Sequence, residues 1–192
     1  GAVNTIDFRT NTGTNTDVIG LIDDLKAHDV TLNGARTIVL GAGGAARAAV
    51  YALVRAGATV TLVNRTMQRA QVMLADLTAS AGIKSVNVAT LDEAIENPVD
   101  LIVNATSAGM WPNVDDSPWI AGVPLPDGVT LYDMVYRPEI TALMRAVESA
   151  GGRAIGGLGM LVRQGAASFK VWTGVDPPLD VMFAAAKEAL AQ

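Results

Sequence analysis

The sequence contains no cysteine and a single histidine, His28, among its 192 residues. The absence of cysteine excludes disulfides, thiol catalysis and thiolate metal sites. One histidine argues against a histidine-rich metal site and against a histidine-based catalytic triad. The chain also lacks any run of about 18 uncharged apolar residues, so we expect no membrane-spanning helix.

Basic residues are few, with 14 Lys and Arg against 19 Asp and Glu and a formal net charge of −5. Proteins that bind nucleic acid normally carry a basic stripe, so we expect no nucleic-acid partner. No positively charged segment followed by an apolar one opens the chain as a signal peptide would. These features predict a soluble protein of the cytoplasm.

The chain also lacks an initial methionine: it begins at Gly1, and its first methionine is Met67. We therefore expect either that residues were removed from the front or that the chain is a piece of a longer protein. Half of the residues are apolar, which is enough for a hydrophobic core. The length fits one domain of about 100–200 residues, or one domain and a fraction.

Short apolar or β-branched runs alternate with helical patterns along most of the chain. Such alternation is typical of a parallel sheet covered on both faces. The sequence therefore predicts an α/β fold, a doubly wound, Rossmann-like parallel sheet with helices on both faces. The expected strands are Thr37–Leu40, Thr59–Val63, Val86–Ala89, Leu101–Asn104 and Thr130–Val135, and a glycine-rich turn follows Ala154–Ile155. The expected helices are Ala45–Ala56, Met67–Leu77 with Thr66 as N-cap, Leu91–Ile95, Ile140–Ala150 and Met160–Val171.

The two ends of the chain do not join this pattern. Ala2–Phe8 alternates as an edge strand does, and Arg9–Gly13 resembles a hairpin turn. Asp17–Ala27 and Leu179–Leu190 are amphipathic helices that offer apolar surface beyond the needs of the central sheet. Their apolar residues are Val18, Leu21, Ile22 and Leu25 in the first, and Leu179, Met182, Phe183, Ala186 and Leu190 in the second.

A glycine-rich turn, Gly41-Ala42-Gly43-Gly44-Ala45-Ala46, joins the first strand of the alternation to its helix. It fits the dinucleotide fingerprint G-x-G-x-x-A. In that fingerprint Gly41 permits the tight turn, Gly43 lets the backbone approach a pyrophosphate, and Ala46 keeps the helix close to the strand. The free N–H groups and positive dipole of the helix N-terminus favour phosphate. We interpret the turn as dinucleotide-binding; a glycine turn without a ligand is the alternative.

The residues after the second strand distinguish NADP from NAD. NAD-binding proteins usually carry Asp or Glu about 20 residues after the glycine turn. This chain instead has Asn64, Arg65 and Thr66, with Arg69 one turn later. Two guanidiniums and a hydroxyl suit a 2′-phosphate, so we expect NADP(H). The alternative is that the two arginines only solvate the start of a helix.

Three more polar segments follow strands where open α/β sheets bind their ligands. They are Asn104–Met110, which contains Thr106 and Ser107, Tyr132–Pro138, and Gly156–Met160, with Gln164 one turn further. A polar turn with an Asn cap explains the first equally well. The glycines of the third would let the backbone pass near a flat ring, or else form a helix C-cap with a turn.

These segments, taken in order, resemble the shikimate dehydrogenase family. The resemblance implies an oxidoreductase acting on a CH–OH group, by NADP-dependent interconversion of 3-dehydroshikimate and shikimate in the route to aromatic amino acids. The matching blocks run over almost the whole chain: GAVNT (Gly1–Thr5), NTDVIG (Asn15–Gly20), GAGGAARA (Gly41–Ala48), NRTMQR (Asn64–Arg69), NATSAGM (Asn104–Met110), DMVYRP (Asp133–Pro138), GLGMLVRQGA (Gly157–Ala166) and WTG (Trp172–Gly174).

The resemblance also implies roles for individual residues. The positions that match substrate contacts are Asn4, Asp17, Tyr136 and Gln164, and Asp17 is the expected catalytic residue. The positions that match cofactor contacts are Gly41, Ala42, Gly43, Gly44, Ala45, Asn64, Arg65, Thr66, Arg69, Thr106, Ser107, Met134, Gly157 and Met160.

Two blocks of the family pattern are absent. Upstream of GAVNT the family has a Ser-x-Ser pair for the substrate carboxylate. It also has an Asn-Val-Thr-x-Pro-x-Lys segment, whose lysine partners the aspartate matched here by Asp17. None of the lysines present, which are Lys26, Lys84, Lys170 and Lys187, lies in that context.

We therefore expect four parts in the chain. Residues 1–15 would be a remnant of a second, α/β substrate domain, 16–33 a connecting helix, 34–174 the NADP-binding domain, and 175–192 a helix that packs on the substrate domain. Without that domain the apolar faces of the two terminal helices would be exposed and would favour homo-oligomers.

The expected function is that of the cofactor-binding part of a shikimate dehydrogenase, weakly active or inactive alone. Quinate/shikimate and aminoshikimate dehydrogenases remain alternatives, because substrate choice depends on the absent segment. A non-catalytic NADP-binding sensor or regulatory module is an alternative of another class. The missing lysine favours it, whereas the presence of Asn4, Asp17 and Gln164 opposes it. Methylene-pterin dehydrogenases share the sheet and the glycine turn, but the NTD and GLGMLVRQ blocks point elsewhere.

Overall fold

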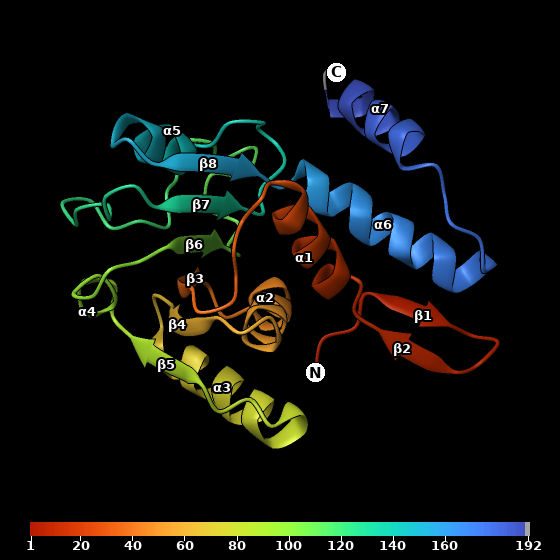
Figure 1. Cartoon of the computed structure of the whole chain (residues 1–192), viewed down its shortest axis with the longest axis horizontal. Helices are drawn as coiled ribbons and strands as arrows, with labels where there is room; N and C mark the ends of the chain where they lie inside the picture. The colour runs from red at the N-terminus through yellow and green to blue at the C-terminus, as the bar shows by residue number, and fades with distance from the viewer. Residues whose placement is uncertain (191–192) are drawn as a thin grey trace.

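The computed structural model describes residues 1–190 and is built around a six-stranded parallel sheet (Figure 1). The strand order is β5-β4-β3-β6-β7-β8, and every neighbouring pair is parallel. The prediction of a doubly wound α/β fold is confirmed. The strands are β3 (Arg36–Leu40), β4 (Thr59–Val63), β5 (Val86–Ala89), β6 (Leu101–Asn104), β7 (Thr130–Asp133) and β8 (Arg153–Gly156).

Helices cover both faces of the sheet because the strands present apolar side chains on both. In β3, Val39 lies in one hydrophobic cluster, whereas Ile38 and Leu40 lie in the other, as the two-residue period of a strand requires. The first cluster is formed with α1 (Asp17–Ala27), α2 (Gly44–Arg55), α3 (Met67–Ala81) and α6 (Leu158–Thr173), and the second with α4 (Leu91–Ala94) and α5 (Ala142–Ser149).

The N-terminal residues form a small separate sheet. Strands β1 (Thr5–Asp7) and β2 (Thr12–Thr14) pair antiparallel, so the predicted hairpin is confirmed, although its first strand is shorter than Ala2–Phe8. This hairpin lies beside the C-terminal end of α6 (Figure 1). The last helix, α7 (Leu179–Leu190), packs on α6 through its predicted apolar face, where the Arg163 guanidinium lies 5.7 Å from the centre of the Phe183 ring.

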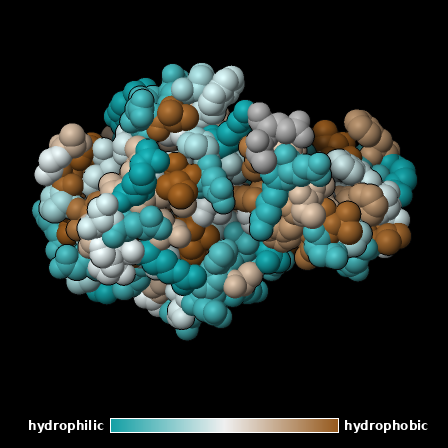
Figure 2. Space-filling view, turned by 90° about the horizontal axis from the view of Figure 1, so that it is seen from above, coloured by the Kyte–Doolittle hydropathy of each residue, from teal (hydrophilic) through white to brown (hydrophobic). Residues whose placement is uncertain are grey.

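The expectation that α1 exposes its apolar face is wrong. Leu21 and Leu25 are fully buried, and Val18 and Ile22 pack against the same cluster, because α1 lies between α2 and α6. Several of the large exposed apolar side chains lie on the hairpin and around the α6–α7 connection, at the right-hand end of the molecule in Figure 2. They include Ile6, Phe8, Trp172, Val175 and Val181.

Several element boundaries differ by a few residues from the predicted ones. Helix α5 begins two residues later than expected because the Thr141 hydroxyl caps it, accepting a hydrogen bond from the Met144 N–H at 3.2 Å. Thr66 is the N-cap of α3, as predicted, but its side chain makes no capping hydrogen bond. Within residues 1–190, no helix is both long and apolar enough to cross a membrane.

Candidate cofactor and substrate site

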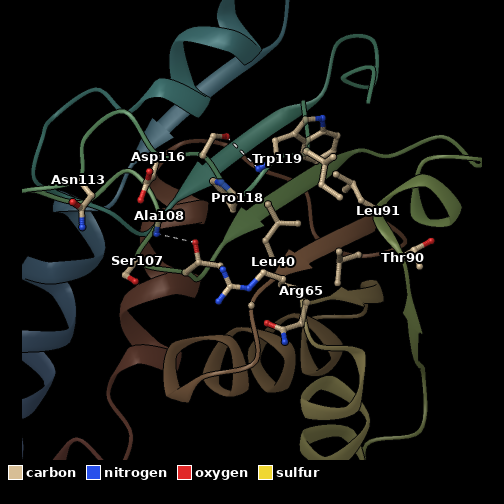
Figure 3. A pocket seen from close by; sticks show the side chains of 16 residues that line it. Leu40, Arg65, Thr90, Leu91, Ser107, Ala108, Asn113, Asp116, Pro118 and Trp119 are labelled. Atoms are coloured by element: carbon tan, nitrogen blue, oxygen red, sulfur yellow. Dashed lines mark hydrogen bonds between the residues drawn. The ribbon is translucent and has the colours of Figure 1, made fainter. Parts of the chain in front are cut away.

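A cavity of about 640 Å³ opens at the carboxyl ends of the strands (Figure 3). It lies where the strand order reverses, between β3 and β6, which is where doubly wound sheets bind their ligands. Its volume is within the range of small-molecule sites. Predicted cofactor residues that line it are Gly41, Asn64, Arg65, Thr106 and Ser107. Its other lining residues include Pro118, Trp119 and Ile120.

The first glycine of the turn is required by the fold. Gly41 has a φ of +111°, which disfavours residues with a side chain. Its N–H donates to the Val63 carbonyl at 2.8 Å, and a Cβ on Gly41 would lie 3.0 Å from the Ala105 carbonyl oxygen. Gly41 therefore holds the ends of β3, β4 and β6 close together, as predicted for the tight turn.

Gly43 differs from Gly41 in having no structural reason to be glycine. Its φ of −95° and ψ of −168° are accessible to any residue, and no heavy atom lies within 4 Å of the position that a Cβ would occupy. It is the N-cap of α2, whose first N–H groups lack intrahelical acceptors. Open space in front of free N–H groups fits a pyrophosphate approaching the backbone.

Two arginines stand at the edge of this turn with their charges available. The Arg65 guanidinium extends across the cavity toward the loop after β6 (Figure 3). Arg69 and Thr66 line an adjoining cavity of about 460 Å³ that also contains Ala42. Within residues 1–190 no carboxylate pairs with either arginine. The arrangement fits an anionic group beside the adenosine of a dinucleotide.

Asn104 and Asp133 form a buried network between the ends of β6 and β7. The Asn104 amide donates to Asp133 at 2.9 Å, and its oxygen accepts from the N–H (3.0 Å) and the hydroxyl (2.7 Å) of Thr106. Asp133 also accepts from the Val135 N–H and the Thr141 hydroxyl. Burial raises the pKa of Asp133, and these hydrogen bonds oppose that rise. The interpretation of Asn104 as the cap of a polar turn fits this geometry, and the turn holds the loop with Thr106 in place.

The glycines at the start of α6 serve contacts within the protein. A Cβ on Gly157 would overlap the Met134 carbonyl oxygen, and a Cβ on Gly159 would overlap the Asp24 carboxylate. Both residues stand at the N-terminus of α6, so the interpretation as a helix C-cap is wrong. The close approach brings two predicted cofactor positions, Met134 and Gly157, directly together.

Three of the four predicted substrate residues meet at one place. The Asn4 amide donates to the Asp17 carboxylate at 2.9 Å, and its oxygen accepts from the Thr16 N–H at 2.9 Å. Because a backbone N–H can only donate, it fixes the Asn4 amide with its NH₂ group toward Asp17. The Thr16 hydroxyl also lies 3.4 Å from the Gln164 side-chain oxygen. Asn4, Asp17 and Gln164 therefore form one polar cluster.

Tyr136 lies apart from that cluster. It is 39% exposed, three residues beyond the end of β7. In the described part of the chain, no hydrogen bond connects it to Asn4, Asp17 or Gln164. Its role as a substrate contact remains a prediction.

Buried hydroxyls that the sequence did not single out support the polar cluster. Ser168 lies 2.7 Å from the Thr5 hydroxyl and 3.0 Å from that of Thr16, and all three residues are buried. Thr5 and Thr16 both reach the Asn4 oxygen, at 3.0 and 3.1 Å. Ser168 therefore connects the polar cluster to α6 through Thr5 and Thr16, which limits the movement of Asn4.

A second unpredicted network joins α1, β7 and α6. The Tyr132 hydroxyl donates to Asp24 at 2.7 Å, and Arg163 donates to the other Asp24 oxygen at 3.1 Å. Burial raises the pKa of Tyr132, and the Asp24 charge raises it further, so the hydroxyl stays a donor. The network fixes α1 against α6, the two helices that carry Asp17 and Gln164.

We predict that replacing Asn4 by alanine raises the pKa of Asp17. Burial already holds this pKa above its usual value of 3.8, and the hydrogen bond from Asn4 opposes that rise. The titration of the Asp17 carboxyl carbon, followed by NMR, measures the change. An acid whose pKa is higher in the folded state contributes stability below its unfolded-state pKa. This stability is lost as pH rises through the folded-state pKa. Because N4A raises the folded-state pKa of Asp17 further, we expect the free energy of unfolding to fall more with rising pH in N4A than in the unchanged chain.

Asn15→Ala is the matched control for this prediction. The Asn15 side chain accepts from the Asp17 backbone N–H and does not touch the Asp17 carboxylate. The Asp17 pKa should therefore move much less in N15A than in N4A. Equal pKa values for Asp17 in N4A and the unchanged chain would contradict the assigned role of Asn4.

Two family models match parts of this chain. Residues 24–111 match the family model "Shikimate / quinate 5-dehydrogenase", and residues 157–187 match "Shikimate 5'-dehydrogenase C-terminal domain". The shikimate dehydrogenase (NADP(+)) of Methanocella arvoryzae is 44% identical over 191 residues, covering 99% of this chain and 70% of that protein. The chain belongs to the shikimate dehydrogenase family.

Solved members of the family have the same fold. A crystal structure of a shikimate dehydrogenase in complex with NADP+ matches 100% of this chain and 68% of its own, with a TM-score of 0.90 and 34% identity. The Thermus thermophilus enzyme in complex with NADP(H) and shikimate covers 93% of this chain and 64% of its own, with a TM-score of 0.80 and 38% identity. The predicted family membership is confirmed.

Proposed function

We propose that this chain binds NADP(H) and provides the cofactor half of a shikimate dehydrogenase, which interconverts 3-dehydroshikimate and shikimate. The observation that carries the proposal is Gly43, a glycine that the fold does not require, beside open space at a helix N-terminus. Arg65 and Arg69 after β4 pair with no carboxylate in the described part of the chain, residues 1–190, which supports NADP(H) over NAD(H).

The proposed roles follow the position of each residue. The turn from Gly41 to Ala45 would hold the pyrophosphate. The 2′-phosphate side of the cofactor would be held by Asn64, Arg65, Thr66 and Arg69. The remainder of the cofactor would contact Thr106, Ser107, Met134, Gly157 and Met160. When bound, the nicotinamide supplies or accepts the hydride. Asn4, Asp17, Tyr136 and Gln164 would contact the substrate hydroxyls.

The residues needed for proton transfer are incomplete in the described part of the chain, because Asp17 has no lysine beside it. An alcohol needs a group that takes its proton, and a carboxylate oriented beside a lysine suits that task. Asp17 has Asn4 as its side-chain partner, whereas Lys170, the lysine on α6, pairs with Asp176 at 2.7 Å. We propose that the 192-residue chain alone turns over shikimate weakly or not at all.

Nucleotide titration and an activity assay test the two parts of the proposal separately. Titrating NADPH, NADP+ and NAD+ into the protein should show affinity for NADP+ at least about tenfold above that for NAD+, a difference of about 1.4 kcal/mol. Shikimate-dependent NADPH formation should stay near background. Absence of nucleotide binding would contradict the cofactor assignment, and robust turnover would contradict the inactivity of the chain alone.

Two alternative functions remain open for this chain. A quinate/shikimate or aminoshikimate dehydrogenase shares this site, and the matched family model includes quinate dehydrogenases. A non-catalytic NADP sensor would have no use for the Asn4–Asp17–Gln164 cluster. Titrating shikimate into the NADP+-bound protein distinguishes the enzyme from the sensor, because only the enzyme's site should bind shikimate.

The division of the chain remains part of the proposal: a substrate-domain remnant (1–15), a connecting helix (16–33), an NADP-binding domain (34–174) and a terminal segment (175–192). Residues 191–192 of that segment lie outside the described residues. A cytoplasmic location also stays a prediction.

We further propose that the 192-residue chain self-associates through the exposed apolar side chains of the hairpin and the α6–α7 connection. Light scattering should show a mass that rises with concentration. A single monomeric species at all concentrations would count against this proposal.

A further inference from the structure

We propose that Arg47 binds the 2′-phosphate of NADP(H) and is a third cation that selects NADP over NAD. This inference rests on the proposed function, since it concerns the same cofactor. Arg47 lies in the first turns of α2, and neither the dinucleotide fingerprint nor the segment after β4 assigns it a role. Its position relative to Arg69 and Thr66 carries the inference.

Arg47 shares a cavity with the residues expected to hold the 2′-phosphate. The cavity of about 460 Å³ is lined by Ala42 of the glycine turn, by Thr66 and Arg69 at the start of α3, and by Arg47 from the facing helix. None of its lining residues is acidic. Two arginines and one threonine therefore line a space that begins at the glycine turn, and guanidinium and hydroxyl groups are donors that a phosphate prefers.

The Arg47 side chain is also held in place before any ligand binds. Its Nη2 donates to the Asp76 carboxylate on α3 at 3.1 Å, and only 18% of the side chain is exposed. Gly1 lies against the same guanidinium, since a Cβ there would be 2.9 Å from Nη1. A restrained arginine loses less conformational freedom on binding than a free one.

The ion pair with Asp76 leaves Arg47 able to bind phosphate. The Asp76 side chain is 59% exposed, and an exposed carboxylate is a weak competitor for a guanidinium. A guanidinium has five N–H donors, and the bond to Asp76 uses one of them. A 2′-phosphate carries more negative charge than a carboxylate and accepts stronger, charge-assisted hydrogen bonds.

The competing explanation is that Arg47 only clamps α2 to α3. A clamp would affect every nucleotide equally, because it acts on the helix and not on the phosphate. A phosphate ligand would affect only nucleotides that carry the 2′-phosphate. The ratio of the two affinities therefore distinguishes the explanations.

The test is the affinity of Arg47→Gln for NADP+ and NAD+, with adenosine 2′,5′-bisphosphate and AMP as shorter probes. We expect R47Q to bind NADP+ and the bisphosphate about tenfold more weakly, a loss of one charge-assisted contact. Its affinity for NAD+ and AMP should change by less than about twofold, within the error of such comparisons. Equal losses for both nucleotides, or no loss for either, would overturn the proposal.

Asp76→Asn is the matched control because it breaks the same ion pair and keeps Arg47. We expect D76N to bind NADP+ at least as tightly as the unchanged chain, since the competing carboxylate is gone. If D76N weakens NADP+ binding as much as R47Q does, the clamp explanation holds. Failure of the unchanged chain to bind any of these nucleotides would instead overturn the proposed function, so the two failures are distinguishable.

Discussion

Replacing Gly159 by alanine is expected to lower the free energy of unfolding by about 3 kcal/mol or more. The new methyl group would overlap the Asp24 carboxylate, which is 2% exposed and has no room to retreat. Any shift of Asp24 disturbs its hydrogen bonds from Tyr132 and Arg163 and leaves the buried Tyr132 hydroxyl without an acceptor. Losing one partner of a buried charged group is among the most destabilising single changes.

Thermal and urea unfolding of G159A measure this loss, which for a chain of this size corresponds to a fall in Tm of about 10 °C. Gly165→Ala is the matched control, because it lies in the same helix and its Cβ would meet the Met182 side chain at an ordinary 3.6 Å. G165A should gain about 0.5–1 kcal/mol from helix propensity. Similar Tm values for the two variants would show that the α1–α6 contact does not depend on Gly159.

The Asp24 network also shows where sequence patterns stop being informative. Asp24 is separated from Tyr132 by 108 residues and from Arg163 by 139. Each of the three fits its own helix or strand, so no local signal marks them as partners. In contrast, the central strands and helices were predicted because apolar periodicity and glycine turns are local properties of the chain.

The error over α1 has a related cause. Amphipathic spacing at Leu21 and Leu25 correctly indicated a helix with one apolar face. The spacing carries no information on which surface covers that face. The surface that covers it is α6, and Gly20 permits this close contact between α1 and α6, since a Cβ on Gly20 would be 2.9 Å from the Gln164 Cβ. The close approach of α1 to α6 is a property of the folded pair of helices.

Gly41 and Gly43 look equivalent in the fingerprint and differ in the structure. Gly41 has a positive φ and a carbonyl oxygen close to its missing Cβ, so the fold itself selects glycine. Gly43 has an extended backbone and open space, so the fold tolerates a side chain there. Selection of glycine at the second position therefore points to a ligand that must come close to the backbone.

Replacing Gly43 by alanine is accordingly expected to separate binding from folding. The Tm should fall by no more than about 4 °C, because the methyl group would enter open space and alanine costs at most about 1 kcal/mol relative to glycine at an N-cap. Affinity for NADP+ should fall about 100-fold, or about 2.7 kcal/mol, because the same methyl group would occupy the approach of the pyrophosphate. NAD+ should lose affinity by a similar factor, since it carries the same pyrophosphate.

Gly41→Ala provides the contrast, with a Tm that falls because alanine at a φ of +111° is strained and its Cβ would crowd the Ala105 carbonyl oxygen. Isothermal titration with NADP+ and NAD+, together with thermal unfolding, measures both properties on both variants. If G43A bound both nucleotides as tightly as the unchanged chain, the pyrophosphate would have to lie elsewhere. The assignment of the pyrophosphate to the N-terminus of α2 would then be wrong, even though the fold would be unaffected.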